Sequence, residues 1–149
     1  RSKVPNVFES EDEIKLGKAA TLVDGDDITI IASGIMVSKS LEAAQKLKSE
    51  GISAGVVNLS TLKPIDRQAI IKSAKKTGCV VTAEEHNIYI GMGALVSSII
   101  SEEYPVPILR CGIKDTFAQS GDYELLMQIY NLTADEIYKL SKNVITMKK

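Results

Sequence analysis

The residues of this sequence that are best suited to chemistry gather in one short stretch, which reads AEEHNIYIGMGA. It contains two adjacent carboxylates, Glu84 and Glu85, and the single histidine of the chain, His86. A carboxylate and an imidazole are side chains used for general acid and base catalysis. If the stretch ends a strand, however, successive side chains point to opposite faces, so the two glutamates cannot work as a pair. We expect one glutamate to be buried and the other to face the loop.

His86 lacks the neighbours that an active site would need. No serine or cysteine stands in a recognisable nucleophile turn, so the pattern of a catalytic triad is absent. No second histidine exists to complete a common metal-ligand set. The sequence therefore assigns no catalytic and no metal-binding residue. It leaves open whether His86 is a general base, a substrate contact or a structural residue. Gly91 and Gly93 are expected to allow a tight turn and a helix that begins close against the sheet.

Two other loops carry polar residues without a specific motif. The first, SGIMVS at 33–38, has neither the GxGxxG of a dinucleotide site nor a P-loop. We interpret it as a strand-to-helix turn with Ser38 or a neighbour as the helix cap. The second, STLKPID at 60–66, contains Lys63 and Asp66 and is interpreted as a turn that leads into a helix cap. Neither loop predicts a function by itself.

Composition and charge exclude several classes of partner. The chain has 149 residues, of which 44% are hydrophobic, and this predicts one domain with a sizeable core. Eighteen basic residues balance nineteen acidic ones, so nucleic acid and anionic membranes are not indicated as partners. No apolar run approaches the roughly 20 residues of a membrane helix, and a cytoplasmic setting is expected. Cys79 and Cys111 each end an aliphatic run, which predicts buried free thiols.

Hydrophobic periodicity predicts the elements that position these loops. The β-type runs at 20–23 and 28–32 flank an Asp-Gly pair, which is typical of a hairpin with antiparallel strands. Strands and helices then alternate, and a capping box of Thr133 and Glu136 begins a last helix. The later strands are AGVVNLS, CVVTA and VPILRC, with helices at 37–47, 66–77 and 92–100. We expect a three-layer α/β/α domain around a five-stranded mixed sheet, mostly parallel with one antiparallel strand.

Three long stretches of the chain resemble one known family. They read IASGIMVSKSLEAAQKLKSEGISAGVVNLSTLKPID, GCVVTAEEHNIYIGMGALVSSII and IKDTFAQSGDYELLMQIYNLTADEI. In this order and at this spacing they resemble the C-terminal domain of transketolase, a thiamine-diphosphate enzyme. Within that group TLKPID, EEH and DTFAQSGDYELL are similar to transketolase proper, especially its short or split form. Ile90 departs from the Gly-Gly-x-Gly that is common in the family, which argues against a close backbone approach at that position.

The resemblance implies a division of labour between domains. Residues 16–149 would form the C-terminal domain, and residues 1–15 would be a linker from a preceding domain. The complete enzyme would transfer a two-carbon ketol unit between sugar phosphates in the pentose phosphate pathway. Thiamine diphosphate and a divalent metal, Mg or Ca, would be bound by the N-terminal and pyrimidine-binding domains or subunit, with none expected in this piece. The chain begins without methionine, and we expect it to be one part of a longer polypeptide.

The resemblance also assigns roles to single residues. Arg1 matches an arginine that contacts the substrate phosphate, for which a guanidinium offers a planar bidentate fork. At a cut chain end, Arg1 would be detached from that pocket. A homodimer is implied, and exposed apolar side chains after the fourth strand would be useful against a partner. The expected interface or substrate-entrance loop contains Glu85, His86, Tyr89, Gly91 and Gly93.

Two other functions remain open from the sequence. The same fold would serve the β subunit of a 2-oxo-acid dehydrogenase E1, where it would also help to dock an acyltransferase core. Alternatively, the chain would be a stand-alone module in which His86 and the strand-end loops bind a small ligand. Substrate assays of the complete protein separate the first alternative, and ligand-dependent stability that requires His86 would indicate the second.

Overall fold

The computed structural model describes residues 5–8 and 14–148. A five-stranded sheet lies at its centre, in the strand order β1-β3-β2-β4-β5. The strands are β1 (Ala20–Val23), β2 (Ile28–Ala32), β3 (Ala54–Asn58), β4 (Val80–Asn87) and β5 (Ile108–Ile113). Strands β3, β2, β4 and β5 run parallel to one another, and β1 pairs antiparallel with β3 at one edge. The predicted mixed sheet with one antiparallel strand is confirmed.

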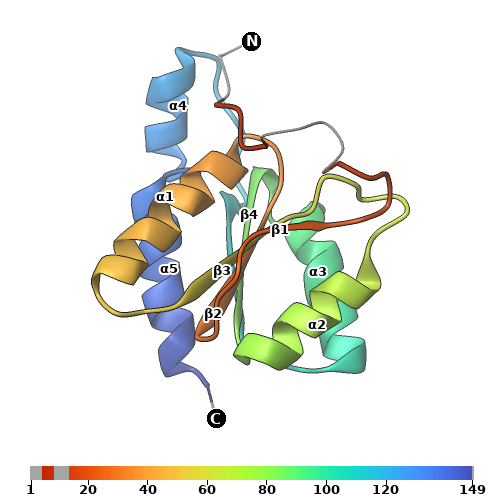
Figure 1. Cartoon of the computed structure of the whole chain (residues 1–149). Coiled ribbons are helices and arrows are strands. Elements are labelled where there is room, and N and C mark those ends of the chain that lie inside the picture. Colours follow the sequence, from red (N-terminus) through yellow and green to blue (C-terminus); the bar gives the residue numbers. More distant parts are fainter. Residues whose placement is uncertain (1–4, 9–13, 149) are drawn as a thin grey trace.

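Helices cover both faces of the sheet, as Figure 1 shows. On one face lie α1 (Met36–Ser49) and α5 (Ala134–Thr146), and on the other lie α2 (Arg67–Thr77) and α3 (Met92–Glu103). A short helix, α4 (Tyr123–Ile129), precedes α5. Alternate residues of β2 enter the two cores, with Ile30 on the α1 and α5 side and Ile31 on the α2 and α3 side. Burial on both faces explains why β2 is apolar almost without interruption.

The predicted hairpin between β1 and β2 is wrong, although the two strands do run in opposite directions. β3 lies between them, because the crossover through α1 brings it back beside β2. The Asp-Gly turn instead crosses the beginning of β3, where a Cβ atom on Gly25 would lie 2.1 Å from the nitrogen of Gly55. The N–H groups of Asp26 and Asp27 donate to the carbonyl of Ser53 at 3.1 and 2.8 Å. Glycine is required here because two backbones touch.

Two helix starts follow the capping residues that the sequence predicts. Asp66 Oδ1 accepts the N–H of Ala69 at 3.1 Å, and α2 ends at Gly78, whose φ is 70°. Thr133 Oγ1 accepts the N–H of Glu136 at 3.2 Å and so caps α5. Each cap satisfies a backbone donor that the first helical turn leaves without an internal acceptor.

One helix start differs from the prediction, and one helix was not predicted. Ser38 does not cap α1, because it lies inside the helix and its hydroxyl donates to the carbonyl of Ile35 at 2.9 Å. Helix α4 is not apparent from the sequence pattern, since Met127 is its only buried residue. Its start is set by Asp122, whose Oδ1 accepts the N–H of Leu125 at 3.1 Å. In the part of the chain that the structure describes, no helix has the length and apolar character to cross a membrane.

Candidate functional site

Glu84 at the end of β4 is a structural residue that fixes the start of α3. Its side chain is 2% exposed. Its Oε2 atom accepts the N–H of Met92 at 2.5 Å, and its Oε1 atom accepts the N–H of Gly93 at 2.8 Å. The N-cap residue of α3, Gly91, has no side chain to accept these hydrogen bonds. A carboxylate is well placed there, because it satisfies free backbone donors and lies at the positive end of the helix dipole.

The two glycines of the loop leave space for that carboxylate. A Cβ atom on Gly91 would lie 2.0 Å from Glu84 Oε2, and one on Gly93 would lie 2.5 Å from Thr82 Oγ1. Gly91 has a φ of −95°, so at this position the reason for glycine is space and not a left-handed backbone. Gly112 on β5 also lies close against the loop, because an added Cβ there would lie 2.7 Å from a methyl group of Ile88. The expected close start of the helix against the sheet is therefore present.

The second glutamate and the histidine lie outside this buried cluster. Glu85 and His86 are both exposed, which confirms that one glutamate of the pair is buried and the other faces the loop. The Nδ1 atom of His86 lies 3.3 Å from the carbonyl oxygen of its neighbour Asn87. Burial raises the pKa of the Tyr123 hydroxyl, and the negative charge of Glu85 raises it further. This geometry offers no acid and base pair, because Glu84 is buried and already accepts two backbone hydrogen bonds, whereas His86 is exposed.

An exposed apolar surface lies beside this loop. We call it the Tyr89 surface, and it consists of Tyr89, Ile90 and Leu95, of which Ile90 is 78% exposed and Tyr89 57%. Ile90 and Leu95 occupy the positions just before and one turn inside the start of α3, which are neighbours in a hydrophobic staple. The guanidinium of Arg110 lies 5.6 Å from the centre of the Tyr89 ring.

Arg110 on β5 holds the backbone of the same loop. Its Nη1 atom donates to the carbonyl of Ile88 at 2.7 Å, and its aliphatic part passes close to Gly93, where an added Cβ would lie 3.2 Å from Arg110 Cδ. Sequence reasoning missed Arg110 and Gly112 because both lie in a strand far from the loop in sequence. The parallel pairing of β4 with β5, which places Thr82 opposite Arg110, is what brings them together.

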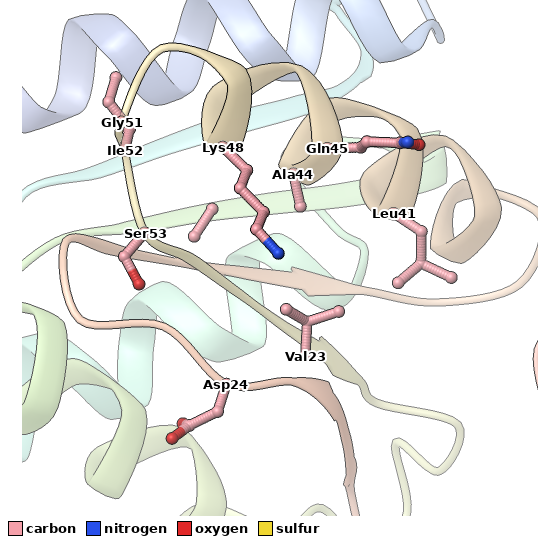
Figure 2. Close-up of a pocket in the computed structure, with 10 residues that line it drawn as sticks. Val23, Asp24, Leu41, Ala44, Gln45, Lys48, Gly51, Ile52 and Ser53 are labelled. Atoms are coloured by element: carbon pink, nitrogen blue, oxygen red, sulfur yellow. The ribbon is translucent and has the colours of Figure 1, made fainter.

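A hollow of about 640 Å³ lies at the opposite edge of the sheet, and Figure 2 shows its lining. It is open between α1 and the loop after β1, with Leu41, Lys48, Val23 and Asp24 among its walls. It adjoins Ala54 at the beginning of β3. In open α/β sheets, ligands usually bind at the carboxyl ends of the strands, and this hollow lies at the amino end of β3. We do not consider it part of the candidate site.

Among the residues that the structure describes, no three His, Cys, Asp or Glu side chains group as a metal site would require. Cys79 and Cys111 are buried free thiols, as predicted. They are not opposite each other, because Cys111 faces Ala83 on β4. Burial raises the pKa of the Cys111 thiol to about 12. Arg1, the expected contact of a substrate phosphate, lies outside the described residues.

Comparison with known proteins decides which family has this architecture. Residues 17–137 match the family described as the C-terminal domain of transketolase. The chain belongs to the transketolase C-terminal domain family. The resemblance drawn from the three sequence stretches is therefore confirmed.

Curated relatives of this transketolase C-terminal domain include proteins named as enzyme subunits. The chain is 40% identical over 148 residues to the 6-deoxy-6-sulfo-D-fructose transketolase subunit SqwH of Clostridium sp. (strain MSTE9), covering 99% of this chain and 46% of that protein. It is 42% identical over 140 residues to a subunit of the apulose-4-phosphate transketolase of Phocaeicola vulgatus, covering 93% and 45%. The chain thus spans less than half the length of these relatives.

Solved structures of transketolases share the fold. A structure described as "Split gene transketolase, inactive beta4 tetramer" matches with a TM-score of 0.95 at 43% identity, covering 100% of this chain and 49% of that one. The transketolase from Leishmania mexicana matches with a TM-score of 0.65 at 21% identity, covering 87% and 18%, which shows a common fold. The predicted transketolase C-terminal fold is confirmed.

Proposed function

We propose that this chain is the C-terminal domain of a split transketolase that transfers a two-carbon ketol unit between sugar phosphates. The observation that carries the proposal is the match to a split-gene transketolase, with a TM-score of 0.95 at 43% identity over the whole chain. Two curated relatives at 40% and 42% identity are also named as transketolase subunits. In this proposal the domain supports assembly and the substrate entrance, and it is not catalytic alone. Residues 1–15 would be the linker from a preceding domain.

The donor groups among the residues that the structure describes do not suit the cofactors that the family implies. When thiamine diphosphate is bound with a divalent ion such as Mg or Ca, it supplies a nucleophilic carbon and a ring that stabilises negative charge on the substrate carbon. The described residues offer no cluster of metal ligands, and the buried carboxylate of Glu84 is occupied by the backbone of α3. We therefore assign both cofactors to the other domains and derive no chemical step from this chain. Calorimetry should find tight thiamine diphosphate binding to the complete enzyme and not to this chain alone.

The Tyr89 surface is proposed as a contact between two copies in a homodimer. Tyr89 and Ile90 are exposed just after the carboxyl end of β4, and burying such side chains stabilises association. Arg110 holds the loop through the carbonyl of Ile88, so the surface is fixed before a partner arrives. The similar split-gene structure is described as a tetramer, which agrees with assembly of multiple copies.

Glu85 and His86 are proposed to border the substrate entrance. Both are exposed at the carboxyl end of β4, the edge at which open α/β sheets usually meet their ligands. Arg1 would bind the substrate phosphate from the end of the preceding domain through a bidentate guanidinium. Replacing His86 with Ala in the complete enzyme should therefore raise the KM for a sugar phosphate more than it lowers kcat.

The sugar phosphates themselves are the finer part of the proposal. We propose a plain transketolase of the pentose phosphate pathway, acting in the cytoplasm, while the names of the two curated relatives refer to a sulfofructose and to apulose 4-phosphate. The complete enzyme should be assayed with xylulose 5-phosphate and ribose 5-phosphate, and in parallel with pyruvate and an artificial electron acceptor. Ketol transfer supports the proposal, whereas oxidation of pyruvate alone would indicate a 2-oxo-acid dehydrogenase E1.

A further inference from the structure

A second exposed apolar surface lies on the segment that follows β5. It consists of Phe117, Leu125 and Ile129, and we call it the Phe117 surface. Phe117 is 98% exposed, and the two α4 side chains are about half exposed. Leu125 and Ile129 are four residues apart and so lie on one side of the helix. Phe117 and Ile129 line one hollow of about 310 Å³ at the surface.

The segment is held in place although its apolar side chains are exposed. The N–H of Gln119 donates to the hydroxyl of Tyr130 at 2.8 Å, which ties the loop to the end of α4. Asp122 caps the helix, and Met127 anchors its inner side in the core. Phe117 is thus presented on a loop with fixed ends, while nothing among the described residues covers its ring. A ring of this size in water is unfavourable unless another surface buries it.

The position of the Phe117 surface in the fold indicates which part of the enzyme would cover this surface. Residues 5–8, which the proposed function makes part of the linker, lie at the same end of the molecule as α4 in Figure 1. Val7 packs against the core cluster that contains Met127 of α4. The curated relatives are more than twice as long as the aligned chain, which covers 46% and 45% of them. If the polypeptide continues through this linker, as the proposed function requires, its other half would begin at the end of the molecule that carries α4.

We propose that the Phe117 surface docks the other half of the same enzyme, the part of the relatives that lies outside this chain. The inference rests on the proposed function, because that function supplies the other half. It assigns separate partners to the two apolar surfaces: the Tyr89 surface contacts a second copy, and the Phe117 surface contacts the half that binds the cofactors. The occupant is a largely apolar protein surface that receives an aromatic ring.

Site-specific photo-cross-linking in the complete enzyme tests this assignment. The photoreactive amino acid p-benzoylphenylalanine replaces Phe117, which tolerates substitution because its ring is exposed in this domain. Tyr104 is the matched control position, since it is a partly exposed aromatic residue that lines a hollow with Met147 at the far end of α5. After irradiation, mass spectrometry of the digested enzyme identifies the attached peptides.

The cross-link from position 117 should attach to peptides of the other half of the enzyme, and the control position should lack this product. Attachment to this domain in a second copy would overturn the assignment, and so would a yield at position 117 no higher than at position 104. Ketol transfer by the unsubstituted enzyme is measured in parallel. If that activity is absent, the proposed function fails whatever the cross-link shows, whereas an active enzyme with the wrong cross-link contradicts only the docking assignment.

Discussion

The carboxylate of Glu84 fills the space that a side chain on Gly91 would need, with Oε2 only 2.0 Å from the position of an added Cβ. The same oxygen accepts the first N–H of α3, from Met92. A strand end and a helix start are therefore joined by one buried side chain. This arrangement explains why the stretch contains both a glutamate and two glycines without forming an acid and base site.

Replacing Gly91 with Ala should destabilise the domain. The added methyl group overlaps the Glu84 carboxylate, which cannot move without losing its hydrogen bonds to α3. We expect the free energy of unfolding to fall by about 1–3 kcal/mol, the usual range for overpacking. Urea denaturation measures it. Gly121→Ala is the control, because its added methyl would meet Leu126 at an ordinary 3.5 Å and should change stability little. Equal stability of the two variants would contradict this explanation of Gly91.

The hydrogen bonds of Glu84 can be separated from the effect of its neighbour Thr82. In Glu84→Gln one of the two acceptor atoms becomes an N–H₂ group that faces a backbone donor, so stability should fall by about 1–3 kcal/mol. Thr82→Val removes a buried hydroxyl that has no hydrogen-bond partner among the described residues, and it should be neutral or slightly stabilising. Thermal unfolding of both variants tests the pair. A larger loss of thermal stability in Thr82→Val than in Glu84→Gln would contradict this prediction. It would show that the Thr82 hydroxyl makes the more stabilising contact.

The sequence predicts most of the sheet but not its order. Strand and helix positions follow from local apolar periodicity, whereas the place of β1 depends on which edge β3 occupies after its crossover, and no local pattern contains that information. The Asp-Gly pair correctly indicates a turn, but the turn does not form a hairpin. Gly25 is needed there because its backbone lies in close contact with that of Gly55. Helix α4 is too short and too little buried to give a periodic stripe.

The candidate site was predictable only where its residues are neighbours in sequence. Alternation in a strand correctly separates buried Glu84 from exposed Glu85. The acceptor role of Glu84 was not visible, because its partners are eight and nine residues away across a turn. Arg110 reaches the loop only through the pairing of β4 with β5. Tertiary contacts of this kind have no sequence signal in one chain.

Cys111 should resist alkylation in the folded protein. Burial raises its pKa to about 12, so the thiol stays protonated well above neutral pH, and the thiolate is the reactive form. Alkylation of Cys111 should become fast only as the pH approaches about 12 or when the protein unfolds. Iodoacetamide labelling at about pH 8, followed by mass spectrometry, measures this. In urea both cysteines should be labelled. Labelling of Cys111 at the same rate in folded and unfolded protein would contradict its burial.

Tyr89→Glu in the complete enzyme should weaken the proposed homodimer. The change removes the aromatic ring and would bury an unpaired carboxylate at the interface, at a cost of about 3 kcal/mol, or about 100-fold in the dissociation constant. Sedimentation velocity over a range of concentrations would show a shift toward the smaller species. Tyr104→Glu, at the far end of α3, serves as the control and should sediment like the unchanged enzyme. An unchanged assembly in Tyr89→Glu would remove the Tyr89 surface from the interface.

The most direct test of the central claim measures ketol transfer from xylulose 5-phosphate to ribose 5-phosphate, with thiamine diphosphate and Mg²⁺ present. The complete enzyme and this chain alone are compared at equal molar concentration. We predict transfer by the complete enzyme and none by the chain alone. Transfer by the chain alone, or a complete enzyme that uses no sugar phosphate as donor, would contradict the assignment of this chain as the noncatalytic C-terminal domain of a transketolase.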